Sequence, residues 1–247
     1  MKKVNYSELL NDNITFEKAE EIQIKYRNLL KRKERKSKYK SLKNISLLAG
    51  VDISYYSKNN IEWGIACVVL WDLKKNIMVN TSYAHDEVKF PYKPGFLGFR
   101  ESKLISIAIK NASKSPELII CDGHGINHPK RFGEATQLGL ALNIPSFGVA
   151  KNPFFGYSNW KEVKRIKGEK NPIWVYNPNT SSGNNEKLGY SICLSDGKKP
   201  VFISVGYNIN IESALYIALK TSFNNRQPEP VYMADKFSRI KIEELSN

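Results

Sequence analysis

The spacing of hydrophobic residues predicts one helix and then three strands in the first part of the chain. Apolar residues recur three or four positions apart, which predicts a helix from about Phe16 to Arg32. Strand-like apolar runs follow at residues 45–56, 61–72 and 76–88. Because the polar stretches between these runs are short enough for hairpins, we predict that the sheet begins with three antiparallel strands.

The middle of the chain alternates helices with short apolar strands. A helical pattern at about 100–113 precedes the strand-like run PELIIC, and a second one at about 131–142 precedes IPSFGVAK. A strand, a helix and a strand at this spacing form a βαβ unit, so part of the sheet is predicted to be parallel.

A polar stretch separates this unit from the remaining strands. Residues 159–187 are rich in Asn, Lys and Ser, and we expect an irregular excursion in which only the run IWVY forms a strand. The runs at 187–195 and 199–207 are joined by SDGK and predict a hairpin.

The C-terminal part predicts two helices and completes one α/β domain. A helix over about 211–222 has Asn210 as its candidate N-cap, and the tail from Pro228 is expected to carry a short closing helix. We divide the chain into a basic helical segment at 1–44, packed on the core, and a main domain at 45–247.

The composition is that of an ordinary globular protein. Its 247 residues are 41% hydrophobic and 25% charged, which excludes disorder, collagen-like repeats and a disulfide scaffold. The three cysteines are far apart, which favours free thiols in a reducing compartment and opposes a zinc ribbon. The N-terminus lacks a secretory apolar region, and no apolar run approaches 18 residues. We therefore expect a cytoplasmic protein that does not span a membrane.

The charge is unusual. There are 38 Lys and Arg against 24 Asp and Glu, a formal net charge of +14. Such a field favours polyanions, above all nucleic acid, although a lysine-rich genome would produce the same excess without binding. The basic run at residues 31–40 has two interpretations of its own, since cations there could compensate the helix dipole or contact phosphate.

Four acidic residues stand in surroundings that suggest chemistry. Asp52 lies inside an apolar strand, Glu101 near the start of a helix, Asp122 at the end of an apolar strand and Asp235 near the chain's end. Each alone could be a cap, a turn residue or a paired acid. Together in a basic protein they predict an acidic cluster whose best occupant is Mg²⁺, a combination that suits phosphodiester chemistry.

The segment DGHGINHPKRFG is the densest polar stretch. Gly123 and Gly125 allow a ligand to approach the main chain. His124 and His128 have a spacing that binds zinc on a helix, but a glycine and a proline oppose a helix here. His128 is better suited to carry a proton or contact phosphate, and Lys151 adds positive charge near the same sheet edge.

The segment FPYKPGFLGFRE contains a second candidate. Pro91 and Pro94 bracket Tyr92 and stiffen its loop. An exposed aromatic side chain on a rigid loop can wedge between bases, whereas a tyrosine packed on the protein surface would have no such role.

These segments, in this order, resemble endonuclease V, a repair nuclease that recognises inosine, the product of adenine deamination. The resemblance rests on GVDISY, PYKPGFLGFRE, ICDGHGINHPKRFGEATQLGL, IPSFGVAKN and PEPVYMAD, and it covers roughly residues 49–235. It implies an RNase H-like α/β fold, with three antiparallel strands followed by parallel βαβ units and flanked by helices. The pattern of the chain independently predicts the same strand arrangement.

The resemblance also implies a mechanism. Mg²⁺, for which Mn²⁺ can substitute, would be held mainly by Asp52 and Asp122, with Glu101 and Asp235 completing the catalytic site together with His128. Tyr92 would fill the gap beside a lesion while the flipped hypoxanthine enters a pocket around residues 123–125. The residues expected to contact substrate are Pro91, Tyr92, Pro94, Arg100, Gly123, His124, Gly125 and Lys151. A monomer would cut DNA containing deoxyinosine or other deaminated bases at the second phosphodiester bond 3′ to the lesion.

The chain departs from the family pattern in two places. Gly206-Tyr207 stands where relatives often have Gly-His, and Lys93 replaces an apolar residue of the wedge, which would add a phosphate contact. Alternative functions are an inosine-specific ribonuclease, a silent nucleic-acid binder and another RNase H-like nuclease such as a junction resolvase. The four acids argue against the binder, and the PYxP and DGHG segments argue against the resolvase.

Overall fold

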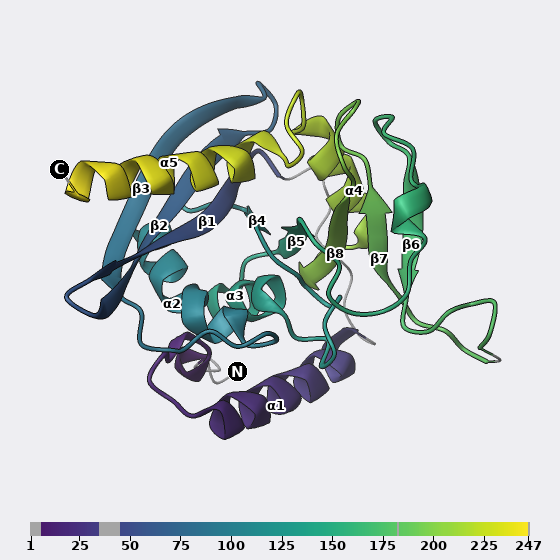
Figure 1. The fold of residues 1–247 in the computed structure, drawn as a ribbon, viewed down its shortest axis with the longest axis horizontal. Helices are drawn as coiled ribbons and strands as arrows, with labels where there is room; N and C mark the ends of the chain where they lie inside the picture. The colour runs from purple at the N-terminus through teal and green to yellow at the C-terminus, as the bar shows by residue number, and fades with distance from the viewer. Residues whose placement is uncertain (1–5, 35–44, 182, 247) are drawn as a thin grey trace.

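The computed structural model describes residues 6–34, 45–181 and 183–246, whose strands form a single mixed sheet flanked by helices (Figure 1). The strands are β1 (Leu47–Lys58), β2 (Ile61–Asp72), β3 (Ile77–Glu87), β4 (Leu118–Cys121), β5 (Ser146–Ala150), β6 (Lys170–Trp174), β7 (Lys187–Ile192) and β8 (Val201–Tyr207). The helices are α1 (Phe16–Glu34), α2 (Leu97–Lys110), α3 (Glu134–Leu142), α4 (Ile211–Lys220) and α5 (Glu229–Ser246), with short 3₁₀ helices η1 (Ser7–Leu10) and η3 (Trp160–Glu162).

The strand order is β3-β2-β1-β4-β5-β8-β7-β6. Strands β1, β2 and β3 pair antiparallel, whereas β4 pairs parallel with both β1 and β5. Helix α3 is the crossover between β4 and β5, and the far side of the sheet is again antiparallel. The predicted fold class is therefore confirmed, with three antiparallel strands followed by a βαβ unit.

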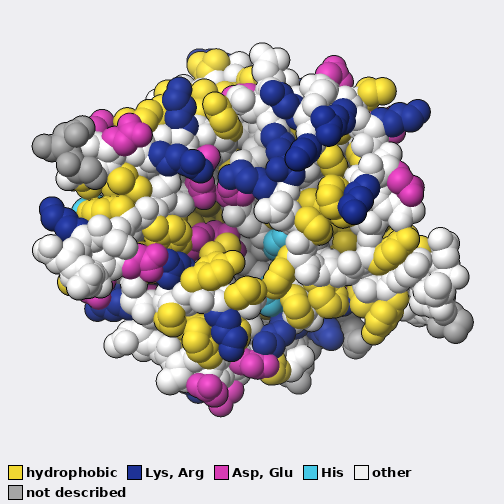
Figure 2. Space-filling view, viewed as in Figure 1, with side chains coloured by type: hydrophobic (Ala, Val, Ile, Leu, Met, Phe, Trp, Pro, Cys, Tyr) yellow, Lys and Arg dark blue, Asp and Glu magenta, His cyan; other side chains and the backbone are white. Residues whose placement is uncertain are grey.

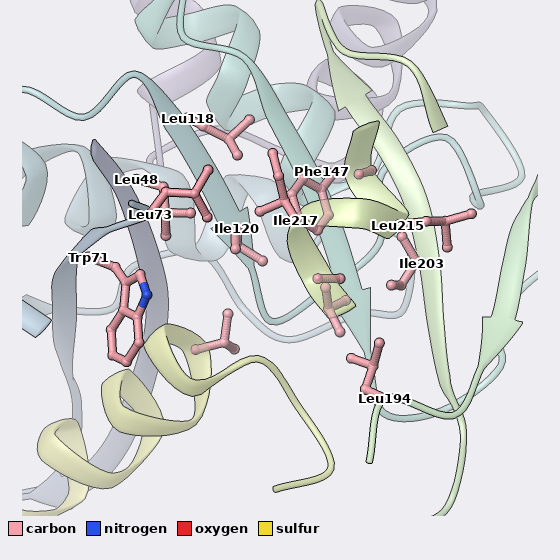
Figure 3. Packing of buried hydrophobic residues seen from close by; sticks show 14 of the residues in the cluster. Leu48, Trp71, Leu73, Leu118, Ile120, Phe147, Leu194, Ile203, Leu215 and Ile217 are labelled. Atoms are coloured by element: carbon pink, nitrogen blue, oxygen red, sulfur yellow. The ribbon is translucent and has the colours of Figure 1, made fainter. Parts of the chain in front are cut away.

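Helices cover both faces of the sheet because its central strands are apolar on both sides. Along β1, Leu48 belongs to the cluster beneath α4 and α5, whereas Ala49 and Val51 pack with α2 and α3. Figure 3 shows the first cluster, in which Phe147 from β5 and Ile217 from α4 meet. The two packed layers fix β1 and β4 side by side at the centre of the molecule.

Helix α1 forms an additional layer outside α2 and α3. Its buried residues Tyr26 and Leu30 share an aromatic cluster with Phe99 and Phe132. In addition, the side-chain amide Nε2 of Gln23 donates a hydrogen bond of 2.8 Å to a carbonyl of the Tyr92 loop. Most of the basic run, and the expected boundary after residue 44, lie outside the described residues.

Two helices begin at other residues than the sequence pattern predicts. Helix α2 starts at Leu97, about three residues early, because the Tyr92 loop ends in a tight turn at Gly95 (φ 91°). Helix α3 starts at Glu134 rather than near residue 131, since Arg131 has a left-handed backbone (φ 54°) that a helix cannot contain.

The C-terminal region holds the largest correction. Helix α5 is 18 residues long rather than short, and it lies across β1 and β2, where it buries Val231 and Ala234. The predicted hairpin forms as β7 and β8, and the predicted N-cap Asn210 accepts a hydrogen bond of 2.8 Å from Ser213 N. Within the described parts of the chain, no helix combines the length and the apolar character needed to cross a bilayer.

Candidate active site

Two neighbouring strands bring Asp52 and Asp122 together. Val51 on β1 is paired in parallel register with Cys121, the last residue of β4. Asp52 and Asp122 are the next residues along each strand, and Asp122 N donates to the Val51 carbonyl at 3.3 Å. Residues that were 70 positions apart in the sequence therefore lie at one edge of the sheet.

Helices on the two faces add Glu101 and Asp235. Glu101 lies in α2 with only 6% exposure, and its carboxylate accepts a hydrogen bond from the Tyr55 hydroxyl. Asp235 lies in α5 and accepts from Arg239 Nε at 2.9 Å. The charge of Asp235 raises the pKa of Asp52, so both helices contribute to one acidic cluster.

The site contains a fifth carboxyl group, that of Glu134, which the sequence did not predict. It occupies the first turn of α3, is 3% exposed, and its Oε2 atom has no hydrogen-bond partner. An acid in the first turn of a helix ordinarily compensates the dipole, so the sequence pattern provides no signal for another role. Its proximity to Glu101, whose charge raises the Glu134 pKa, depends on the packing of α3 against α2.

The electrostatics of this cluster are dominated by burial and mutual repulsion. Burial, reinforced by the charges of Asp122 and Glu101, raises the pKa of Asp52 to about 9. Burial likewise raises the pKa of Glu101 to about 7 and the pKa of Asp122 above its ordinary value. Groups that hold protons for lack of neutralising charge are well suited to a cation.

Two side chains hold Asp122 in place. Lys151, which follows β5, contacts Asp122 Oδ2 at 2.5 Å, and the Gln227 Nε2 amide donates to Oδ1 at 2.8 Å. The Arg226 guanidinium in turn donates to the Lys151 main-chain carbonyl. Lys151 was predicted to lie near this sheet edge, whereas nothing in the sequence indicated Gln227.

A cavity of about 450 Å³ adjoins the acids. Its walls come from the Tyr92 loop, the DGHG turn, the start of α3 and the segment after β5, and they include Tyr92, Gly123, His124, Glu134 and Phe154. Figure 2 shows acidic and histidine side chains in a hollow near the middle of this face, with Lys and Arg side chains across its upper part. A nucleic-acid backbone would meet positive charge beside this hollow.

The Tyr92 side chain is 69% exposed at the rim of the cavity. Lys93, Pro94 and Gly95 continue the cavity wall, and the Lys93 ammonium also lies over the rings of Phe16, at 4.6 Å, and Phe96. Lys93 therefore helps to fix the loop on α1.

The two histidines connect loops. His128 is 4% exposed, its Nε2 atom is 3.0 Å from the Gly95 carbonyl, and its Nδ1 atom accepts from the Lys130 amide. His124 Nε2 is 3.1 Å from the Asn152 carbonyl, and Phe154 packs against both imidazole rings. Burial lowers the pKa of each histidine to about 4, so both are neutral at physiological pH.

Three of the predicted substrate contacts do not line the cavity, and the first is the exposed Pro91. Arg100 is 7% exposed and is engaged inside the protein by Glu62, at 2.5 Å, and by the Phe90 carbonyl. Gly125 faces β8, where its amide donates to Ser204 Oγ at 2.9 Å, rather than the cavity. Of the DGHG residues it is Asp122, Gly123 and His124 that line the cavity.

The oxygen-only donor set fits a hard cation, because Mg²⁺ prefers carboxylates and commonly uses only one or two of them together with water and phosphate. Asp52 and Asp122 form such a pair. In the parts of the chain that the structure covers, no three His, Cys, Asp or Glu side chains approach closely enough to hold an ion by themselves.

Comparison with known proteins identifies the family. The Endonuclease V family profile matches residues 27–236. The chain belongs to the Endonuclease V family. It is 35% identical over 198 residues to an Endonuclease V of Nostoc punctiforme, covering 80% of this chain and 84% of that protein. It is 37% identical to one of Dictyoglomus turgidum, covering 80% of each chain.

Solved Endonuclease V structures have the same fold. The enzyme of Streptomyces avermitilis superposes with a TM-score of 0.78 at 30% identity, covering 94% of this chain and 95% of that one. The Ciona intestinalis enzyme, solved with a 24mer DNA containing an inosine followed by a ribo-adenosine, has a TM-score of 0.67 at 28% identity, with 83% and 89% covered. The chain is therefore an endonuclease that hydrolyses phosphodiester bonds in DNA, as the sequence resemblance implies.

Proposed function

We propose that this member of the Endonuclease V family is a Mg²⁺-dependent DNA repair enzyme that recognises deoxyinosine and hydrolyses the second phosphodiester bond on its 3′ side. One observation carries the proposal: the Asp52–Asp122 pair lies directly beside a cavity whose rim carries Tyr92. Because the base would lie in the cavity and the reacting phosphate at the adjoining carboxylates, the arrangement supports cleavage away from the lesion itself.

The buried carboxylates are the support for the metal. Endonuclease V nucleases are metal-dependent, and an oxygen donor set suits Mg²⁺, with Mn²⁺ as a substitute. Asp52 and Asp122 would hold the ion, with Glu101 and Asp235 beside them. When bound, it supplies activation of a water molecule and stabilisation of charge on the phosphate.

The surrounding residues orient the reacting groups. Lys151 and Gln227 hold the two oxygens of Asp122 in fixed directions, and the half-buried Lys151 ammonium adds positive charge where phosphate would lie. Tyr55 holds Glu101 through its hydroxyl. His128 positions the Tyr92 loop through Gly95 rather than moving a proton, because both of its ring nitrogens are occupied by main-chain groups.

The cavity and the Tyr92 loop would recognise the lesion. A flipped purine fits between the loop and the DGHG turn, where Gly123 allows the base to approach the main chain. The exposed Tyr92 ring would fill the space that the base leaves in the duplex. The inosine-containing DNA bound by the Ciona enzyme supports deoxyinosine as the target.

A ribonuclease acting on inosine in single-stranded RNA is a second candidate. The oligonucleotide bound by the Ciona enzyme carries a ribo-adenosine directly after its inosine, so a related site accommodates a 2′-hydroxyl at that position. Matched DNA and RNA oligonucleotides, each with a single inosine, distinguish the two by their cleavage rates.

The test of the proposed function is single-turnover cleavage of a deoxyinosine oligonucleotide, with product length read at single-nucleotide resolution. We expect Mg²⁺-dependent cleavage at the second phosphodiester bond 3′ to inosine. A matched strand with adenine in place of inosine should not be cleaved. Asp52→Asn and Asp122→Asn should abolish cleavage but retain DNA binding, whereas Asp86→Asn, at an exposed ion pair with Lys103, should act normally. Near-normal cleavage by either active-site variant would refute the proposal.

A further inference from the structure

The carboxyl group of Glu134 lies in the wall of the cavity with an unused acceptor. We propose that Glu134 reads the base by accepting a hydrogen bond from the N1–H group of a 6-oxopurine such as hypoxanthine, and thereby rejects adenine. This inference rests on the proposed function, because it needs a purine in the cavity, and it adds the residue that distinguishes the deaminated base from its parent.

The burial of Glu134 is the first observation. The side chain is 3% exposed, lines the cavity, and has an Oε2 atom without any hydrogen-bond partner. Buried polar atoms in proteins nearly always have partners, since leaving one unpaired is costly. The missing partner of Glu134 is accounted for if the substrate supplies it.

The surroundings of the carboxyl are the second observation. A Cβ atom on Gly123 would lie 2.1 Å from Glu134 Oε2, so the carboxyl rests directly on the DGHG main chain. Two nearby backbone donors are already used, since the Gly133 amide donates to the Gly125 carbonyl at 3.0 Å and the Ala135 amide to the His124 carbonyl. The Glu134 carboxyl is also hydrogen-bonded with Glu101, which leaves Oε2 as the oxygen without a partner.

Among the described residues that line the cavity, one other buried side-chain atom lacks a partner, His124 Nδ1. Because His124 Nε2 lies against the Asn152 carbonyl, it carries the proton, and Nδ1 is also an acceptor. Both buried side-chain atoms of the cavity wall that lack a partner are therefore acceptors, and they match a base edge that presents donors.

Deamination creates that donor. Adenine presents an unprotonated N1, an acceptor, beside its 6-amino group, whereas hypoxanthine presents N1–H beside a carbonyl oxygen. The Glu134 carboxyl donates its proton to Glu101, so its unpartnered oxygen is an acceptor that attracts the N1–H group and repels the N1 lone pair of adenine. Guanine shares N1–H, so Glu134 separates hypoxanthine from adenine but does not by itself exclude guanine.

The experiment pairs a protein change with a substrate change. Wild type and Glu134→Met, a substitution of similar length without hydrogen-bonding groups, are tested by single-turnover cleavage of DNA containing either deoxyinosine or 1-deaza-deoxyinosine. The analogue has C–H at position 1 and, in its oxo tautomer, carries the ring proton on N3. We expect the wild type to cleave the deaza substrate roughly 10- to 100-fold more slowly, and the variant to show a much smaller penalty, because the change at N3 affects both proteins alike. Glu212→Leu removes an exposed first-turn carboxylate from α4 and should behave as wild type.

Two results would overturn the inference: a variant that retains the full deaza penalty, or a wild type that shows none. Neither concerns the proposed function, whose own failure would be a wild type that cannot cut deoxyinosine DNA. Thermal melting reports whether Glu134→Met folds, and it should, because the substitution removes the repulsion between the buried carboxyls of Glu134 and Glu101. If Glu134→Met does not fold, Glu134→Leu is tested with the same two substrates.

Discussion

Replacing Asp52 with Asn should make the metal-free protein more stable while it abolishes cleavage. Asp52 lies in β1 among the carboxyls of Asp122, Glu101 and Asp235, and burial together with their charges raises its pKa to about 9 from an ordinary 3.8. An asparagine has nearly the same shape as a neutral aspartic acid but cannot ionise. The variant therefore removes the electrostatic cost and leaves the packing unchanged.

The sign and size follow from the two pKa values. The folded state binds the Asp52 proton more tightly than the unfolded state does. The loss of folding free energy that comes from ionising Asp52 is therefore absent below about pH 3.8, grows as pH rises, and is complete above about pH 9. At pH 7 the gap of about three pKa units corresponds to about 4 kcal/mol. Small side-chain movements and entering water reduce this cost, so we expect Asp52→Asn to gain about 2–4 kcal/mol.

Urea unfolding followed by tryptophan fluorescence in EDTA, at several pH values between 5 and 9, measures the effect. The stability gain of Asp52→Asn over wild type should widen with pH, by at most about 1.4 kcal/mol per unit. Mg²⁺ should stabilise the wild type and leave the variant nearly unaffected. Equal metal-free stabilities at pH 8, with parallel pH dependence, would show that the carboxylates do not repel one another as described.

Further predictions concern the residues around the acids. Tyr92→Ala should lower the ratio of inosine to adenine cleavage without changing the melting temperature, because the ring is largely exposed. An unchanged ratio would show that Tyr92 does not act as a wedge. Lys151→Met should leave Asp122 without its cation and slow single-turnover cleavage by roughly 10- to 1000-fold, and wild-type rates would contradict its placement beside the phosphate. His128→Ala should cost about 1–2 kcal/mol in urea unfolding by releasing the Gly95 carbonyl, yet preserve the shape of the cleavage pH profile between pH 7 and 9. The pKa of His128 in the folded protein is about 4, below its ordinary 6.5. The contribution of this imidazole to the free energy of unfolding should therefore fall as the pH drops from 6.5 towards 4, and the alanine variant should lack this pH-dependent loss.

The strands of the sheet could be predicted from local hydrophobic patterns in the sequence. Strand runs are contiguous in the sequence, and their short hairpins leave few alternatives, so β1, β2 and β3 appear where periodicity predicts them. Helix ends were less predictable, because they depend on single backbone angles such as the left-handed Arg131. The length of α5 was underestimated because the spacing of its apolar residues is explained only by their packing on β1 and β2.

Asp52 and Asp122 could be predicted as partners because both belong to apolar strands, and adjacent parallel strands place their ends at one edge. Glu134 could not, since a carboxylate in a first helical turn looks the same whether it faces solvent or a buried cavity. Arg100 likewise belongs to the motif of the Tyr92 loop, yet Glu62 on strand β2 directs its guanidinium inward.

The amino-acid order by itself determined the strands, the acidic positions, the stiff Tyr92 loop and the family to which the chain belongs, because each of these is written in contiguous residues. Only the tertiary structure decided which charges face one another: Lys151 on Asp122, Glu134 beside Glu101, and helix α5 over β1. Electrostatic and desolvation energies depend on distance through space and on exclusion of water, and neither quantity exists until the chain has folded.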